Sequence, residues 1–182
     1  MAAMRTRLLG LSFSLLLACG DGQSEPDAPP SENEEDEVAE PDGREPCEVP
    51  SDPAALLAYL RRGDYKQFEH ESAGHASSGP HGGRVFTYVN ELLAESLEQG
   101  NSTHPRCSAS IKELYLGNAE VSGWSVLVKT EDASKSGRGY YWLETTSTRA
   151  GRAPDYAGQG AAICVGCHSA GRDYFRTPWP LQ

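Results

Sequence analysis

The chain has 182 residues, 38% of them hydrophobic, and its 16 basic and 26 acidic residues give a net charge of −10. This length suits one domain with an extension. No apolar run reaches the roughly 20 residues that a membrane-spanning helix needs, and no stripe of Lys and Arg is present that could neutralise phosphates. The composition therefore argues against an integral membrane protein and against a nucleic-acid partner.

The first 18 residues have the order of an export signal. Arg5 and Arg7 precede the apolar stretch Leu8–Leu17, and the small residue Ala18 follows. A positively charged start, an apolar stretch and a small residue at the cleavage site are typical of a secretory signal peptide. We expect residues 1–18 to be removed on export.

The end of this signal, Leu16-Leu17-Ala18-Cys19, resembles the bacterial lipobox, in which the cysteine is acylated and becomes the first mature residue. The resemblance implies that Cys19 carries lipid. Gly20 after it is similar to the residue found in lipoproteins that are sorted to the outer membrane. We therefore expect an exported protein that is lipid-anchored to the outer membrane and faces the periplasm.

An acidic, proline-rich segment follows the lipidated cysteine. Residues 20–52 contain 13 of the 26 acidic residues and a single basic residue, Arg44. Such a composition cannot bury enough apolar surface to offset the entropy of ordering the chain. We interpret residues 19–51 as a disordered tether that holds the domain away from the membrane. An acidic docking tail for a basic partner is the alternative.

Residues 52–182 are expected to fold, because about 130 residues can bury roughly two thirds of the unfolded surface. Capping residues predict two helices, at 53–62 and 91–99. Alternating β-branched and aromatic residues predict four strands, at Arg84–Val89, Ser110–Leu116, Trp124–Thr130 and Tyr140–Thr146. Turns are expected at Gly117-Asn118 and at 136–139. This order predicts an α+β domain, mainly an antiparallel β-sheet with flanking helices.

One pentapeptide near the C-terminus carries the chemistry. Cys164-Val165-Gly166-Cys167-His168 is the c-type haem attachment sequence. The two thiols can add to the haem vinyl groups, and the adjacent imidazole can bind the iron from one side. A redox dithiol would follow a strand of a βαβ unit, and a zinc site would need a second pair of ligands nearby. The sequence offers neither context, so we expect one covalently attached haem c with His168 as axial iron ligand.

Two cysteines remain after lipid and haem are assigned. Cys47 and Cys107 can form a disulfide, because a bacterial periplasm is oxidising. The bridge would close a loop of about 60 residues and stabilise the fold by ~4 kcal/mol in the chain-entropy model. Two free thiols are the alternative.

The second axial position of the iron decides the function. The only methionines are Met1 and Met4, and both leave with the signal peptide, which excludes a His/Met electron carrier. The other histidines lie in polar surroundings and are interpreted as mainly surface residues: His70, His75, His81 and His104. His81 is the best of them as a second haem ligand. We expect instead an open axial site where a small molecule binds.

Several segments together resemble the cytochrome P-460 family: His81–Asn90, Ile111–Tyr115, Gly123–Lys129, Tyr141-Trp142 and Cys164–Tyr174. The resemblance as a whole covers about residues 55–180, and the segment Ile-Lys-Glu-Leu ahead of the haem motif makes it specific. The resemblance implies a mostly antiparallel β domain, a five-coordinate haem and often a homodimer. The family includes enzymes that oxidise hydroxylamine and the cytochrome c′-beta branch, which binds nitric oxide or carbon monoxide.

In the enzyme branch a lysine of this strand bonds covalently to the porphyrin, and the matching position here is Lys112. Strand alternation places Lys112 on one face with Ser110 and Leu114, and Ile111 and Glu113 on the other. A lysine among leucines could direct its amine toward the haem edge. The alternative is a lysine whose stem lies on apolar surface while its amine reaches water.

Two functions of different classes are compatible with this site. In the first, hydroxylamine or nitric oxide binds the iron and is oxidised, and a partner cytochrome takes the electrons. In the second, the protein binds nitric oxide or similar gases without turnover; a bis-His electron carrier is a third possibility. Glu144 could accept protons from hydroxylamine, but we interpret it as an exposed strand residue and assign it no role.

Overall fold

The computed structural model describes residues 43–117 and 119–182. The predicted signal peptide, Cys19 and most of the predicted tether lie outside the described residues, as does Asn118 of the expected turn. In the described part of the chain, no helix is long and apolar enough to cross a membrane.

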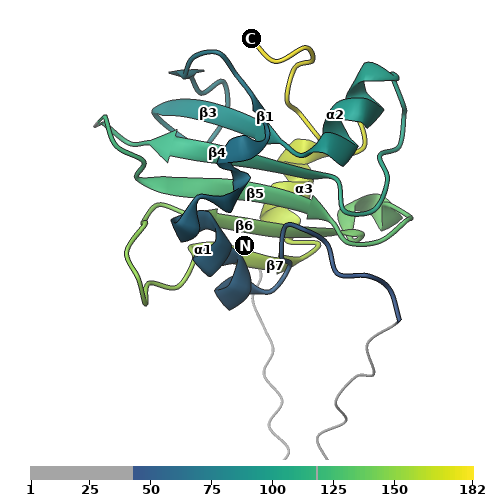
Figure 1. Cartoon of the computed structure of the whole chain (residues 1–182), viewed down its shortest axis with the longest axis horizontal. Helices are drawn as coiled ribbons and strands as arrows, with labels where there is room; N and C mark the ends of the chain where they lie inside the picture. Colours follow the sequence, from purple (N-terminus) through teal and green to yellow (C-terminus); the bar gives the residue numbers. More distant parts are fainter. Residues whose placement is uncertain (1–42, 118) are drawn as a thin grey trace, which may run out of the picture. The chain divides into compact units, whose positions relative to one another are not determined.

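The described residues fold around one antiparallel sheet of seven strands (Figure 1). The strands are β1 (Glu69–His70), β2 (His75–Ala76), β3 (Arg84–Val89), β4 (Ala109–Tyr115), β5 (Gly123–Lys129), β6 (Tyr140–Thr145) and β7 (Tyr156–Gln159). The helices are α1 (Pro53–Arg62), α2 (Glu91–Glu98) and α3 (Ala162–His168), with short 3-10 helices η1 (Asp64–Gln67) and η2 (Lys135–Gly137). The strand order is β1-β3-β4-β5-β6-β7, with β2 also paired to β3. This is the predicted α+β architecture.

Both predicted helices begin at the expected capping residues. Before α1, the side chain of Asp52 accepts a hydrogen bond from the backbone N–H of Ala55 at 2.9 Å. Before α2, the side chain of Asn90 accepts one from Leu93 at 3.2 Å. Each cap satisfies a backbone donor that a helix leaves unpaired at its start. Gly63 ends α1 in the left-handed conformation, as predicted.

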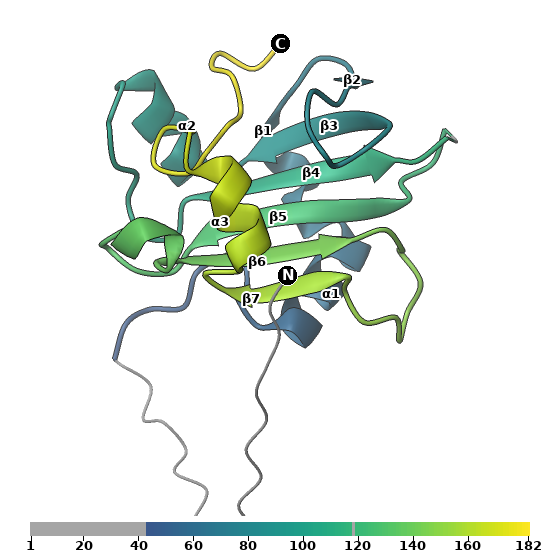
Figure 2. The ribbon, with the colours of Figure 1, turned by 180° about the vertical axis from the view of Figure 1, so that it is seen from behind.

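The helices cover opposite faces of the sheet. Helix α1 lies on one face, as Figure 1 shows, and α3 crosses the other, as Figure 2 shows from behind. The α1 side contains a core to which Leu56, Leu60, Ile111, Trp124 and Val126 contribute. A second core joins α2 and the segment after α3 to β5 and β6. The sheet is therefore the middle layer, and α3 carries the haem motif on the face opposite α1.

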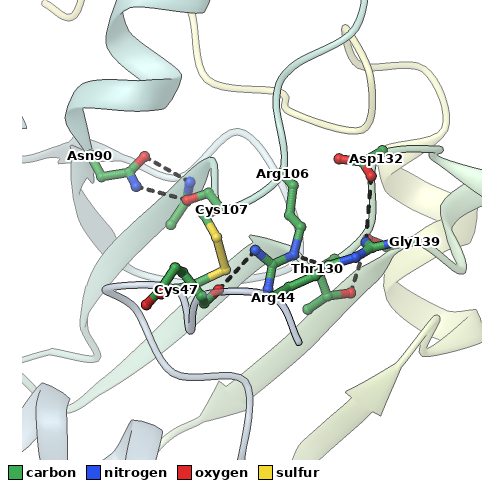
Figure 3. Close-up of a disulfide and its surroundings, with 10 residues drawn as sticks. Arg44, Cys47, Asn90, Arg106, Cys107, Thr130, Asp132 and Gly139 are labelled. Carbon is green, nitrogen blue, oxygen red and sulfur yellow. Dashed lines mark hydrogen bonds and ion pairs between the residues drawn. A yellow bond between two sulfur atoms is a disulfide. The ribbon is translucent and has the colours of Figure 1, made fainter. Parts of the chain in front are cut away.

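The packed part of the chain begins before Asp52, the residue at which the fold was expected to start. Cys47 and Cys107 are joined by a disulfide, with their Cα atoms 5.2 Å apart (Figure 3). The side-chain amide of Asn90 donates a hydrogen bond to the backbone carbonyl of Cys107 at 2.8 Å. Val49 is fully buried in the core beneath α1. The last residues of the expected tether are thus part of the domain.

The four predicted strands match β3 to β6 to within one residue at each end, but β1, β2, β7 and α3 have no counterpart in the prediction. Strand β7 has the sequence Tyr-Ala-Gly-Gln and is largely exposed, so it has no apolar alternation to detect. It is held by antiparallel pairing with β6, with Gln159 opposite Tyr141. The chain then turns directly into α3, which places the haem motif beside the centre of the sheet.

Candidate functional site

A cavity of about 350 Å³ lies between the sheet and α3, a volume in the range of small-molecule sites. The strands contribute Val85, Lys112, Trp142 and Glu144 to its wall. Helix α3 contributes Ile163, Cys164, Cys167 and His168, and the segment between β2 and β3 contributes His81. Both cysteines and the histidine of the predicted haem motif therefore face one space, together with Lys112.

His168 has the geometry of a metal-binding imidazole. Its Nδ1 lies 2.8 Å from the carbonyl oxygen of Tyr174, which makes Nδ1 the donor and leaves Nε2 for a metal. Burial lowers the pKa of His168 to about 4. The ring is therefore neutral near pH 7, as binding to a metal requires. The indole of Trp142 packs against it with a centroid separation of 4.8 Å and restrains the ring's orientation.

A buried ion pair holds the segment that contains Tyr174, whose carbonyl accepts the hydrogen bond from His168. Lys129 is fully buried on β5, and its Nζ donates to a carboxylate oxygen of Asp173 at 2.7 Å. The Ser134 hydroxyl also donates to that carboxylate, and Tyr140 donates to the Asp173 backbone carbonyl at 2.8 Å. Burial would raise the pKa of Asp173, but these hydrogen bonds outweigh it and lower the pKa. The turn next to Tyr174 is thus fixed to the sheet, a contribution that was not predicted from the sequence.

The two cysteines of the motif are not bonded to each other. Cys164 is half-buried, and burial followed by the charge of Glu144 raises its pKa to about 11. Its sulfur is therefore a protonated thiol rather than a reactive thiolate at neutral pH. Cys167, one helical turn later, is exposed. Their placement on one side of α3 suits two thioether links to one planar group.

Lys112 lies across the cavity from α3, on β4. The predicted strand phase is observed: Lys112 lines the cavity, and Ser110 joins Lys112 and His168 in a smaller pocket on the same face of the sheet, while Ile111 and Glu113 face the α1 side. Burial lowers the pKa of Lys112, against the opposing charge of Glu71. A lowered pKa raises the fraction of neutral amine, the form that can form a covalent bond. The structure thus brings the candidate cross-linking lysine to the same cavity as His168.

Two histidines are less exposed than their sequence context predicts. His104 is 1% exposed and contacts Phe175, so its interpretation as a surface residue is wrong. His81 lines the cavity with its side chain 13% exposed, which corrects the same interpretation. His70 and His75 are exposed, as expected.

Glu144, which was expected to be an exposed strand residue, is also part of the cavity. Its side chain is 21% exposed and accepts a hydrogen bond from Nδ1 of His81 at 2.8 Å. Two polar side chains that are distant in sequence therefore meet at the wall opposite His168. No sequence signal joins them, because 63 residues separate them.

The donor set of the cavity fits a haem. Two thiols and a neutral imidazole are presented from α3, and aromatic and aliphatic side chains form much of the remaining wall. The indole N–H of Trp142 is buried and has no acceptor among the described residues. Arg176 lines the same cavity and donates to the Cys167 carbonyl at 2.9 Å. As a fixed cation at the rim, it is suited to a haem propionate.

Comparison with models of known protein families finds none that matches this chain. Comparison with curated proteins likewise finds no match. A functional assignment therefore has to rest on the residues and geometry of the cavity.

Proposed function

We propose that this protein is a mono-haem c-type cytochrome of the cytochrome P-460 type. In this proposal it binds and oxidises a small nitrogenous molecule, hydroxylamine or nitric oxide. The observation that carries the proposal is the position of Cys164, Cys167 and His168 on one short helix facing a cavity, with His168 oriented through Nδ1. A haem bound there would supply an iron that binds small nitrogen ligands and exchanges electrons.

The residues around the cavity have separate roles in this proposal. Cys164 and Cys167 hold the cofactor covalently, and His168 is the axial ligand on the α3 side. Oxidation of hydroxylamine to nitric oxide releases electrons and protons in equal numbers. Glu144 is the carboxylate of the cavity wall that can accept protons, and a partner cytochrome takes the electrons.

Lys112 favours the enzyme over a protein that only binds gas. Its partly desolvated amine lies in the cavity. A C–N bond to the porphyrin edge would replace one amine N–H and one porphyrin C–H, and the two electrons and two protons released would pass to an external oxidant such as dioxygen or a peroxide. Burial lowers the pKa of this amine and so raises the fraction that is neutral and nucleophilic, compared with a lysine in water. A gas-binding protein of the cytochrome c′-beta type has no need for such a lysine.

The test uses holoprotein made in a host that matures c-type cytochromes. We expect oxidation of hydroxylamine with a one-electron acceptor, a red-shifted ferrous absorption band, and a haem peptide joined to the peptide that contains Lys112. Lys112→Arg is the matched variant, because it keeps the charge and removes the nucleophile. A haem protein without turnover and without the cross-link would contradict the enzyme and support gas binding.

The remaining expectations concern location and partners. We propose an exported protein anchored through lipid at Cys19, with the haem domain facing the periplasm and paired as a homodimer in the manner of the family. Mass analysis of the mature N-terminus tests the lipid, and an unacylated N-terminus would contradict it. Sedimentation of the holoprotein tests the pairing.

A further inference from the structure

His81 stands opposite the haem-binding histidine. The centres of the His81 and His168 rings are 6.2 Å apart and their planes are inclined by 68°. An imidazole nitrogen lies about 2 Å from the first-row metal that it binds. The ring centre lies roughly a further 1 Å beyond that nitrogen, so two imidazoles on opposite sides of one iron have ring centres about 6 Å apart, the spacing found here.

Both rings are also oriented as metal ligands usually are. Metal-binding histidines nearly always donate their second ring N–H to a carboxylate or a backbone carbonyl. Nδ1 of His168 donates to the Tyr174 carbonyl, and Nδ1 of His81 donates to the Glu144 carboxylate, each at 2.8 Å. In both rings Nε2 is the nitrogen that remains for iron.

The two histidines differ in how firmly the chain holds them. His168 ends α3, and the buried Lys129–Asp173 pair fixes the turn behind it. His81 lies in a segment between β2 and β3 that contains Gly79, Gly82 and Gly83, and these glycines are exposed. Gly82 and Gly83 have φ values of 69° and 58°, a conformation that glycine adopts at little cost. Such a segment can move without disturbing the core.

We propose that this chain departs from the five-coordinate haem that the family resemblance implies: His81, positioned by Glu144, is the second axial ligand of the haem iron at rest, and the incoming small molecule displaces it. This inference rests on the proposed function, since it requires a haem held by His168. His81 then occupies the axial site but can be displaced from it. Glu144 remains as the hydrogen-bond partner of the released imidazole and holds it at the cavity wall.

As a resting iron ligand, the imidazole of His81 competes with the small molecule for the iron. If His81 occupies the iron in 90–99% of molecules, a small ligand binds about 10–100-fold more weakly than to the free site. His81→Ala should therefore raise the affinity for carbon monoxide by that factor. His70→Ala is the control, because His70 is an exposed histidine on β1 that does not line the cavity.

The test is electron paramagnetic resonance and absorption spectroscopy of the full-length ferric holoprotein, followed by titration of the ferrous form with carbon monoxide. The proposal predicts a low-spin six-coordinate spectrum that becomes high-spin in His81→Ala and stays low-spin in His70→Ala. Glu144→Gln should remain low-spin but shift the reduction potential upward, because an amide donates less charge to the imidazole than a carboxylate does.

A wild-type spectrum that is high-spin and unchanged in His81→Ala would overturn the His81 ligand while leaving the haem assignment intact. A protein without covalent haem would overturn the proposed function itself. A high-spin wild-type spectrum overturns the proposal even if a variant does not fold, and a low-spin spectrum that stays unchanged in His81→Ala overturns it as well.

Discussion

The Lys129–Asp173 pair holds the turn next to Tyr174, the residue whose carbonyl orients His168. Lys129 is 0% exposed and Asp173 5% exposed, and their charged groups are 2.7 Å apart. The lysine amine also donates to the His104 carbonyl at 2.7 Å. Lys129→Met fills a similar volume but leaves the Asp173 carboxylate buried without its cation.

Removing one partner of a buried pair usually costs 3–5 kcal/mol, because the remaining charge stays desolvated. We expect Lys129→Met to lower the free energy of unfolding by about 4 kcal/mol, a large share of the 5–15 kcal/mol typical of a domain. Equilibrium unfolding in urea, followed by far-UV circular dichroism of the holoprotein, measures this loss.

Two further variants test whether the loss of stability comes from the unpaired buried charge of Asp173 rather than from replacing a lysine as such. Lys135→Met removes the partly exposed pair with Glu131 and should cost less than about 1 kcal/mol. In the double variant Lys129→Met with Asp173→Asn, part of the loss should be recovered, because no buried charge is left unpaired. A loss below about 1 kcal/mol in Lys129→Met alone would refute the reasoning.

The same fold makes three further predictions. Replacing Cys47 and Cys107 by serine should lower the free energy of unfolding in urea by ~4 kcal/mol, since their separation is 60 residues; an unchanged value would contradict this. Gly137→Ala should cost about 1–3 kcal/mol and speed amide exchange in α3, because φ is 86° and a Cβ would lie 2.7 Å from Val165; unchanged exchange would contradict it. Burial lowers the pKa of His104, so stability should fall as pH drops below about 6.5. In His104→Gln, the midpoint of urea unfolding should therefore change less between pH 7.5 and pH 5.5 than it does in the wild type.

Proton uptake by the unfolded chain sets the direction of this pH dependence. The unfolded chain takes up a proton on His104 below about pH 6.5, whereas the folded protein excludes it until the pH is lower. The unfolded state therefore binds more protons in this range, and stability rises with pH. A wild-type and a His104→Gln midpoint that change equally with pH would contradict this assignment.

Local patterns were sufficient for the helices and the central strands. The Asp52 and Asn90 caps and the alternation in β3 to β6 depend on neighbouring residues, and the structure confirms them. The predicted haem motif is also a local pattern, and covalent haem stays a prediction. Strand β7 escaped prediction because backbone pairing to β6, rather than side-chain alternation, keeps it in place.

The wall of the site could not be predicted in the same way. His81 meets Glu144 across 63 residues, and Lys129 meets Asp173 across 44. Such contacts arise only when the sheet brings distant segments together. A polar histidine in a glycine-rich segment has the same local sequence whether it faces water or a cavity, so His81 was interpreted as a surface residue.

Covalent haem is tested most directly by the intact mass of the protein purified from a host that matures c-type cytochromes, measured after acid–acetone extraction of loose haem. We predict the mass of the chain plus one haem, which proteolysis then places on the peptide containing Cys164 and Cys167. Cys164→Ser with Cys167→Ser should yield a chain without retained haem. A wild-type chain that loses all its haem on extraction, or that carries zinc in place of iron, would contradict the haem assignment and the function proposed from it.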